Sequence, residues 1–293
     1  MKKEIEVCFL DDFPSLTEGV LSLVNISKNQ IQKYLSKKSL KQKVYKQQIY
    51  NLPLDIINYN RINPIYVGKP IKKIDEDDLF YVVSKPAKIH CHPHSYCEHD
   101  NVLSGLLSEN IRHVLNVNSD KYDRGLLYRL DFETSGLLIL TKSNELLGKI
   151  RTGLNDFIKT KIYLAVVEGK FQSTENIINY LEPFGEKNSK MRVTGAVTTL
   201  LAKCDTEFIE YNSDKNMSLI KVRLYEGHRH QIRVQLSNLG HPIIGDDLYG
   251  SREWERMLLH CYHYTIKTET IERSFKDSNL DFLSGLFNFD GKL

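Results

Sequence analysis

The sequence feature that most restricts the possible folds of this chain is a set of short apolar segments, each about as long as a β-strand. Four segments are rich in β-branched and aromatic residues. They span residues 77–86, 136–142, 161–169 and 217–227. Two segments with apolar residues at helical spacing, 101–115 and 229–240, are interleaved with them. Because the order lacks the regular spacing of a βαβ repeat, the pattern predicts an α+β fold rather than a doubly wound parallel sheet.

Composition bears mainly on membranes and on the redox compartment. The 293 residues include 40 Lys and Arg against 37 Asp and Glu, so the formal charge is only +3. No apolar run approaches the roughly 20 residues of a membrane helix, and the first residues lack the apolar stretch of a secretory signal. Five scattered cysteines fit a reducing compartment. We therefore expect a cytoplasmic protein without a membrane partner, and an organelle is also compatible.

A basic stretch precedes the first of these strands. Between residues 19 and 54 there are seven lysines and no acidic residue. Residues 26–40 have apolar side chains at helical spacing with lysines on another face, which predicts a short basic helical unit. We expect a small helical unit over residues 1–64, whose lysines form either a solvated helix face or a surface for phosphates. The lysines expected to contact phosphates are Lys33, Lys37 and Lys38.

Arg129 and Asp131 stand two positions apart, just before the apolar run 137–140. If residues 128–131 form a strand, alternation places both side chains on one face. Gly136 then allows the turn that returns the chain to the core. A nearby cation would keep Asp131 ionised, and a positioned carboxylate can act as a nucleophile or a base. From this stretch alone, a structural ion pair is the favoured explanation of the two residues.

Two further stretches contain residues that suit a site. Arg229 and Arg233 stand one helical turn apart in a segment that looks partly buried. A buried arginine almost always has a partner, and Asp131 is a natural one. Tyr163 lies within an apolar strand, where it is either core packing or a flat ring for a base.

Residues 90–99 hold six side chains that can bind metals. Zinc needs about four ligands that converge tetrahedrally, but Pro93 and the irregular spacing match no recognised finger pattern. We therefore expect an ordinary loop and no metal site. The six side chains are His90, Cys91, His92, His94, Cys97 and His99.

Taken together, these stretches resemble the RluA family of pseudouridine synthases. The motifs occur in the family's order, from about Pro70 to Tyr264. They lie at residues 75–93, 128–142, 159–169, 190–200, 226–250 and 258–264. Tyr128 stands where the family usually has His, and His228 and Cys91 are also atypical. These departures put in doubt which RNA is bound rather than which reaction is run.

The resemblance implies a pseudouridine synthase catalytic domain over residues 65–270, followed by a C-terminal extension over residues 271–293. Its central sheet would be mixed, largely antiparallel and flanked by helices. The implied enzyme is a monomer that isomerises specific uridines in structured RNA, ribosomal RNA before transfer RNA. Isomerisation needs neither a metal nor a redox cofactor. The N-terminal unit is similar to a small RNA-binding domain of ribosomal-protein type.

The resemblance also implies roles for individual residues. Asp131 would be the catalytic carboxylate, and Arg233 would pair with it. Tyr163 would stack on the target ring and assist late proton removal. Arg129 would insert where the target base leaves the stack. The remaining residues expected to contact RNA are Arg229, His230 and Gln231.

Other classes of protein remain to be weighed against this one. A catalytically idle RNA-binding or ribosome-assembly protein on the same fold is the main alternative, although it would not need Asp131, Tyr163 and Arg233. A phosphotransferase of the haloacid dehalogenase type would need a second aspartate two residues after Asp131, where this chain has Glu133. A zinc protein built on residues 90–99 is a third.

Overall fold

The computed structural model describes residues 3–24, 26–59, 61–153 and 157–288. Contacts divide the chain into two compact units. The first comprises Met1–Gly68, His92–Arg112 and Asn118–Arg124, and the second comprises Lys69–Cys91, His113–Val117 and Gly125–Leu293. The boundaries expected after residues 64 and 270 stay predictions, and residues 289–293 of the expected extension lie outside the described residues. Every helix among the described residues is too short to cross a lipid bilayer.

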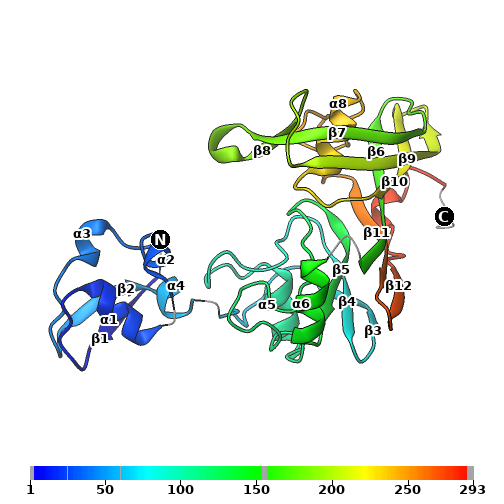
Figure 1. Ribbon diagram of the computed structural model, residues 1–293. Coiled ribbons are helices and arrows are strands. Elements are labelled where there is room, and N and C mark those ends of the chain that lie inside the picture. Colours follow the sequence, from blue (N-terminus) through cyan, green and yellow to red (C-terminus); the bar gives the residue numbers. More distant parts are fainter. Residues whose placement is uncertain (1–2, 25, 60, 154–156, 289–293) are drawn as a thin grey trace. The chain divides into compact units, whose positions relative to one another are not determined.

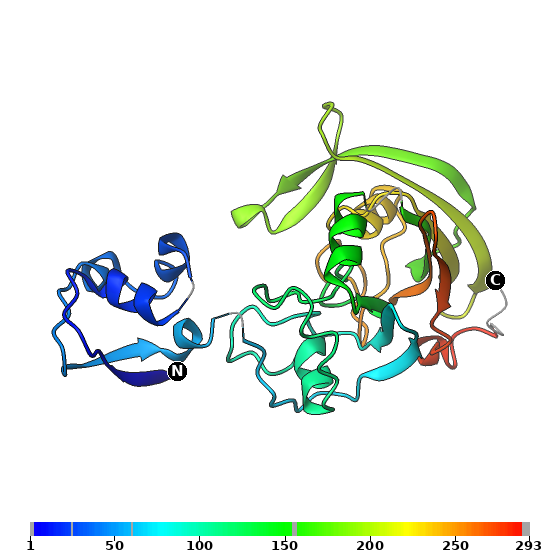
Figure 2. The same ribbon diagram turned by 60° about the horizontal axis from the view of Figure 1, so that its bottom comes forward.

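In the first unit, the short helices between residues 16 and 40 lie on one side of a two-stranded antiparallel sheet (Figures 1 and 2). The N-terminal part is therefore mixed rather than purely helical. Its core contains Phe9, Val20, Ile31, Leu52 and Ile56. The elements of the unit are β1 (Glu4–Cys8), α1 (Leu16–Leu23), α2 (Lys28–Ile31), α3 (Lys37–Leu40), β2 (Ile49–Pro53), α4 (Leu54–Ile57) and α5 (Val102–Ser108).

The short helical unit predicted over residues 26–40 consists of two helices, α2 and α3. A serine caps each of them: the side chain of Ser27 accepts a hydrogen bond from the backbone of Gln30, and that of Ser36 accepts one from Ser39. Serine is favoured at such caps because its hydroxyl competes with helical backbone bonds elsewhere. Ser36 therefore starts a new helix.

The second unit is built on a ten-stranded sheet in the order β3-β4-β5-β11-β6-β10-β9-β7-β8, with β12 also paired to β11. Only β5 and β11 run parallel, so the expected mixed, largely antiparallel sheet is confirmed. The strands are β3 (Lys72–Glu76), β4 (Phe80–Lys85), β5 (Ser135–Thr141), β6 (Ile158–Glu168), β7 (Thr174–Phe184), β8 (Lys190–Thr194), β9 (Leu201–Asn212), β10 (Met217–Leu224), β11 (Leu259–Lys267) and β12 (Glu272–Lys276).

Two α-helices pack against this sheet, α6 (Asn144–Thr152) on β5 and α8 (Gln231–Asn238) on β7 and β8 (Figure 1). All residues of β4 and β5 are buried, which explains their continuous apolar sequences. The four predicted strands are confirmed as β4, β5, β6 and β10. The two predicted helices are confirmed as α5 and α8, both shorter than expected.

The strand predicted over residues 128–131 is wrong, because the chain is irregular there and β5 begins only at Ser135. The cause is the neighbouring carbonyl of Phe132. It accepts hydrogen bonds from the backbone N–H of Lys88 and from Nζ of the buried Lys85. Donors from another part of the chain thus replace a strand partner at the end of this segment.

Gly136 lets β5 lie directly against β11. Its φ of +109° belongs to the left-handed region, and a Cβ there would lie only 2.3 Å from the carbonyl oxygen of Cys261. Glycine is therefore required at this position. The close approach holds the loop from Asp131 to Thr134 beside the middle of the sheet.

Candidate active site

Arg233 is the buried centre of a cluster of carboxylates. It lies on α8 and is only 2% exposed. Its Nε and Nη2 donate to the two carboxylate oxygens of Asp246, each at 2.8 Å. Backbone N–H groups of Leu248 and Tyr249 donate to the same aspartate. This two-pronged bond fixes the orientation of the guanidinium.

The remaining nitrogen of Arg233 points to two carboxylates that reach solvent. Nη1 lies 3.5 Å from Oδ2 of Asp131 and 3.4 Å from Oε2 of Glu133. Burial alone would lower the pKa of Arg233, but Asp246, Asp131 and Glu133 together raise it above its usual value. A permanent positive charge therefore stands beside Asp131, whose side chain is 28% exposed.

The expected pairing of Arg233 with Asp131 is present, but Asp246 is the closer partner, and sequence reasoning missed it. Asp246 follows Gly245, which has a φ of +77° and no room for a Cβ beside the carbonyl of Arg256. A Gly-Asp pair shortly after a buried arginine was the available signal. Glu133 was also missed as a neighbour of Arg233.

Tyr163 lies among buried side chains on β6, directly opposite Cys261 of β11. Burial, followed by the neighbouring Cys261 and Tyr264, raises the pKa of Tyr163 well above its usual value, and the charge of Asp131 adds to this. The ring of Tyr264 stacks on Tyr128 with centroids 4.3 Å apart. Tyr163 is therefore a neutral ring in an aromatic layer, within electrostatic range of Asp131.

Arg129 and His230 differ in their contacts with the rest of the protein. Arg129 is exposed, and none of the described residues offers its guanidinium a hydrogen bond or an ion pair. The Nδ1 atom of His230 lies 3.0 Å from the hydroxyl of Tyr249. Burial lowers the pKa of His230, against the opposing charge of Asp131, so this imidazole is neutral at pH 7.

Arg229 and Gln231 are bound to other parts of the same unit. Arg229 donates to the backbone carbonyls of Asn188 and Lys190. Gln231 is buried, donates to the carbonyl of Lys203 and accepts from the backbone N–H of His228. These bonds anchor the start of α8. A role in RNA contact for either residue stays a prediction.

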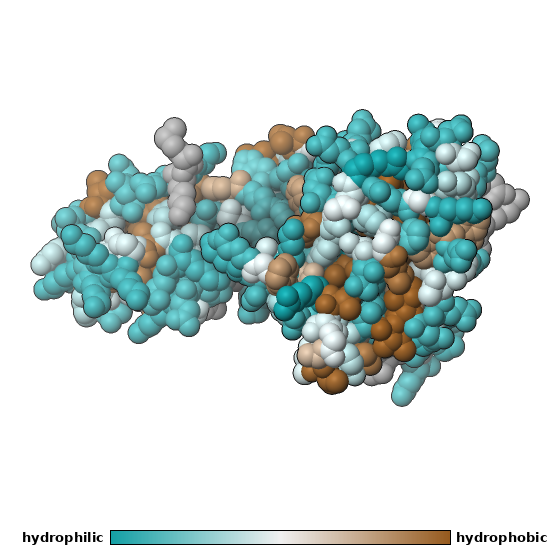
Figure 3. Space-filling model, turned by 90° about the horizontal axis from the view of Figure 1, so that it is seen from above, coloured by the Kyte–Doolittle hydropathy of each residue, from teal (hydrophilic) through white to brown (hydrophobic). Residues whose placement is uncertain are grey.

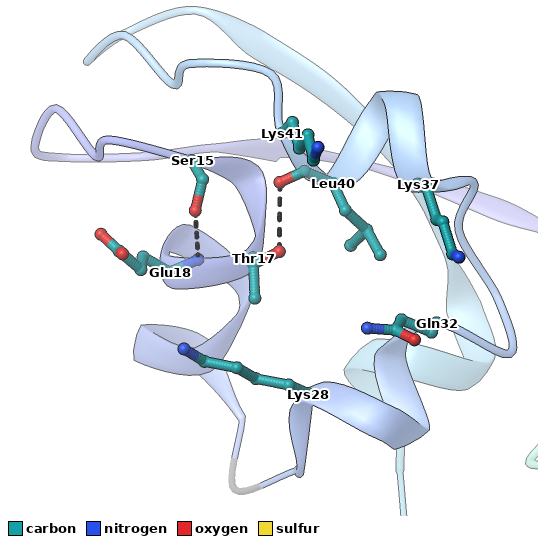
Figure 4. A pocket seen from close by; sticks show the side chains of 8 residues that line it. All are labelled: Ser15, Thr17, Glu18, Lys28, Gln32, Lys37, Leu40 and Lys41. Carbon is teal, nitrogen blue, oxygen red and sulfur yellow. Dashed lines mark hydrogen bonds between the residues drawn. The ribbon is translucent and has the colours of Figure 1, made fainter.

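The lysines of the first unit include a group around a cavity of about 310 Å³ between α1, α2 and α3 (Figure 4). Lys37 lies on its rim, whereas Lys33 and Lys38 are exposed elsewhere. Glu18 is the acid at this cavity. The N-terminal residues present a mainly hydrophilic surface in Figure 3. The lining consists of Ser15, Thr17, Glu18, Lys28, Gln32, Lys37, Leu40 and Lys41.

Side chains from residues 90–99 have contacts within their own units. The thiol of Cys91 is buried and lies 3.3 Å from both the N–H and the carbonyl of Leu130. Nε2 of His99 lies 3.4 Å from the side-chain amide of Asn63. The backbone N–H of Cys97 donates to Asp55. The expectation that this loop holds no metal stays a prediction.

The model of the family described as "RNA pseudouridylate synthase" matches residues 79–238, more than half of the chain. The chain belongs to the RluA-type family of RNA pseudouridine synthases. The part matched to this pseudouridine synthase family contains Asp131, Tyr163 and Arg233, and it ends before Asp246. The expected pseudouridine synthase catalytic domain is confirmed.

Similar pseudouridine synthases come from distant organisms. The chain is 30% identical over 210 residues to "Ribosomal large subunit pseudouridine synthase D" of Borreliella burgdorferi, covering 71% of this chain and 64% of that protein. It is 33% identical over 202 residues to the mitochondrial "tRNA pseudouridine(32) synthase" of Saccharomyces cerevisiae, covering 68% of this chain and 42% of that protein. The chain thus spans less than two thirds of the length of these curated relatives.

A solved pseudouridine synthase supports the fold. The human "RNA Pseudouridylate Synthase Domain Containing 1" superposes with a TM-score of 0.59 at 21% identity, covering 73% of this chain and 86% of that one. At this identity the similarity shows a shared fold.

Proposed function

We propose that this chain isomerises uridines in RNA to pseudouridine and that Asp131 is its catalytic carboxylate. One observation carries the proposal. Asp131 reaches solvent while its carboxylate lies 3.5 Å from a buried guanidinium that Asp246 holds in place. This carboxylate is accessible to solvent and lies beside a positive charge whose position is fixed. Those are the properties that a nucleophile or a base needs.

The reaction needs few protein groups besides one positioned carboxylate. The glycosidic carbon–nitrogen bond of uridine breaks, a carbon–carbon bond forms at ring carbon five, and the proton from that carbon is released as the ring nitrogen gains one. No atom is lost and nothing is oxidised. Asp131 either attacks the ring or assists a sugar-side intermediate. The raised pKa of Tyr163 favours a stacking role over proton removal by the tyrosine alone.

The target uridine must leave its stack to reach Asp131, which costs a few kcal/mol. The unpaired guanidinium of Arg129 is suited to fill the space that the base leaves. Stacking on an aromatic ring such as Tyr163 contributes about 1–3 kcal/mol for each base. Together these contacts offset the unstacking.

We expect Asp131→Asn to abolish isomerisation, because the amide keeps the shape of the side chain but not its charge. Glu133→Gln is the matched control, since Glu133 lies equally close to Nη1 of Arg233 and also reaches solvent. Pseudouridine formation is measured on RNA from a strain that lacks the gene. An Asp131→Asn protein within tenfold of wild type, or a Glu133→Gln protein as inactive as Asp131→Asn, would contradict the assignment.

We propose ribosomal RNA and transfer RNA as substrate classes, because relatives named for each are similar to this chain. Of the two, ribosomal RNA is our first choice. Mapping pseudouridines in cells with and without the protein distinguishes the two. The alternative, a catalytically idle RNA-binding or ribosome-assembly protein, requires that no pseudouridine depend on the chain. The monomeric state, the cytoplasmic location and the lack of a cofactor stay predictions.

We also propose that the N-terminal lysines contact RNA phosphates. Lys33, Lys37 and Lys38 were the residues expected from the sequence. The cavity of Figure 4 supports a second set, because Lys28, Lys37 and Lys41 line one space in which the acid is Glu18. Phosphate contacts of this kind position RNA without reading its sequence.

A further inference from the structure

Phe132 is an exposed aromatic residue immediately after Asp131. Its side chain is 39% exposed, although phenylalanine is among the residues most often buried. No role among those argued above uses it. The ring is exposed beside the carboxylate of Asp131, which also reaches solvent. It can therefore bind a ligand with a flat apolar face.

The backbone of Phe132 is held firmly. Its carbonyl accepts hydrogen bonds from the N–H of Lys88 at 2.8 Å and from Nζ of Lys85 at 3.1 Å. Lys85 is fully buried and also donates to the carbonyls of Pro86 and Ile89. The ring of His90 lies 4.8 Å from the ring of Phe132 and supports it from one side. The exposed ring therefore projects from a rigid turn.

Lys88 adds a cation and a link to a second aromatic residue. Its φ of +64° lies in the left-handed region, which is unfavourable for a residue other than glycine. Such strain persists where surrounding contacts enforce it, often at functional sites. Nζ of Lys88 donates to the carbonyl of Glu255 at 2.6 Å, next to Trp254, the chain's only tryptophan, which is also exposed.

We propose that Phe132 is a specificity-determining residue that stacks on the RNA base next to the target uridine. The inference rests on the proposed isomerisation at Asp131. When the uridine leaves the helix, its neighbour loses a stacking partner, and a rigid ring beside Asp131 replaces that partner. The ring makes no hydrogen bond, so it favours any neighbour with a good stacking face over one that stacks poorly. The ammonium group of Lys88 adds positive charge beside the phosphate backbone.

The test uses a synthetic RNA that spans the uridine mapped in the strain lacking the gene. Two further RNAs replace the base on its 5′ or its 3′ side by an abasic residue. Kd is measured by fluorescence anisotropy, and KM and kcat by pseudouridine formation. The proteins are wild type, Phe132→Ala, Phe132→Tyr and, as control, Phe184→Ala, which removes a phenylalanine of similar exposure at the end of β7.

We expect Phe132→Ala to raise Kd and KM about tenfold on the intact RNA while kcat stays within threefold. The Kd of wild type should rise by a similar factor on one of the two abasic RNAs. On that RNA, the Kd of Phe132→Ala should be no higher than on the intact RNA. Phe132→Tyr should restore wild-type values, and Phe184→Ala should match wild type. Melting temperatures check that all four proteins are folded.

Two results would overturn the inference. In one, Phe132→Ala binds the intact RNA within twofold of wild type. In the other, Phe132→Ala raises Kd by the same factor on both abasic RNAs as on the intact RNA. The effects of the variant and of the missing base would then be independent, which means that the ring and the neighbouring base do not touch. Failure of the proposed function looks different, because wild type would then form no pseudouridine.

Discussion

At the scale of single residues, the three carboxylates around Arg233 are not equivalent. Asp246 is wholly buried, whereas Asp131 and Glu133 reach solvent. We expect Arg233→Ala to lower the free energy of unfolding by about 3–5 kcal/mol, because it leaves the charge of Asp246 buried without a partner. Asp131→Asn removes a solvent-exposed partner and should cost less than about 1 kcal/mol.

Urea titrations of the two variants test this ranking of partners. Asp246→Asn is the matched variant, since it should destabilise the protein far more than Asp131→Asn although both replace the same residue type. Equal losses for Asp246→Asn and Asp131→Asn would mean that Arg233 does not depend on its buried partner. Activity assays alone cannot rank the partners, because both variants are expected to be impaired.

The residue motifs were sufficient to predict that Arg233 and Asp131 lie together, because a buried arginine needs an acid and the two stretches contain few other candidates. They could not rank the acids. The distance from Nη1 to Asp131 and the two-pronged bond to Asp246 depend on how α8 and its following loop pack. That packing is set by contacts from distant segments such as Arg256 beside Gly245.

At the scale of elements, β5, β11 and the segment after β12 meet in a buried array. Nδ1 of His260 lies 2.9 Å from the hydroxyl of Ser135, and Nε2 lies 3.5 Å from Asp277. The residue types match a hydrolytic triad, but all three side chains are buried from any substrate. Burial, followed by the charge of Arg256, lowers the pKa of His260 to about 3.

The lowered pKa of His260 predicts acid sensitivity. Between pH 6.5 and about 3 the unfolded chain binds a proton at this histidine that the folded chain excludes, so stability falls as pH falls through that range. The slope is at most about 1.4 kcal/mol per pH unit. Burial raises the pKa of Asp277, which acts in the opposite direction, since its contribution is lost as pH rises through the raised pKa.

Chemical denaturation of wild type and His260→Gln from pH 4 to pH 8 isolates the contribution of the histidine. The variant should lose less stability than wild type on acidification below pH 6.5, and the two curves should run parallel above it. Parallel curves over the whole range would show that His260 takes up no extra proton on unfolding.

The elements themselves were predicted with uneven success, for identifiable reasons. Continuous β-branched runs gave β4, β5, β6 and β10, because buried central strands need such sequences. The irregular backbone at residues 128–131 could not be predicted, because the donors to the neighbouring Phe132 carbonyl come from Lys85 and Lys88, far away in the sequence. The division of residues 26–40 into two helices has a local signal in the capping serines Ser27 and Ser36. The strand order could not be predicted, because nothing local to β11 indicates that it lies between β5 and β6.

At the scale of the whole molecule, RNA binding should depend on salt through the N-terminal lysines. Replacing Lys28, Lys37 and Lys41 by Gln removes the cations of the cavity. If each contacts one phosphate, the slope of log K against log salt should flatten by about 2 to 3 units. Fluorescence anisotropy with the full chain at several salt concentrations measures this slope.

A second triple variant compares the outer lysines with those of the cavity at the same loss of charge. Replacing Lys33, Lys38 and Lys43 by Gln removes the same net charge from exposed positions outside the cavity lining. A larger effect of this second set would favour the outer lysines over the cavity. An unchanged slope in both folded variants would rule out the N-terminal lysines as phosphate contacts.

The position of β11 also dictates when during synthesis the protein can first work. Asp131, Tyr163 and Arg233 all emerge before residue 234, but β11, which joins β5 to β6, ends at Lys267. Until then the nascent chain holds two unjoined groups of strands, β3 to β5 on one side and β6 to β10 on the other. A chain that ends before Leu259 therefore carries every proposed catalytic side chain but lacks the strand that joins the two groups of strands.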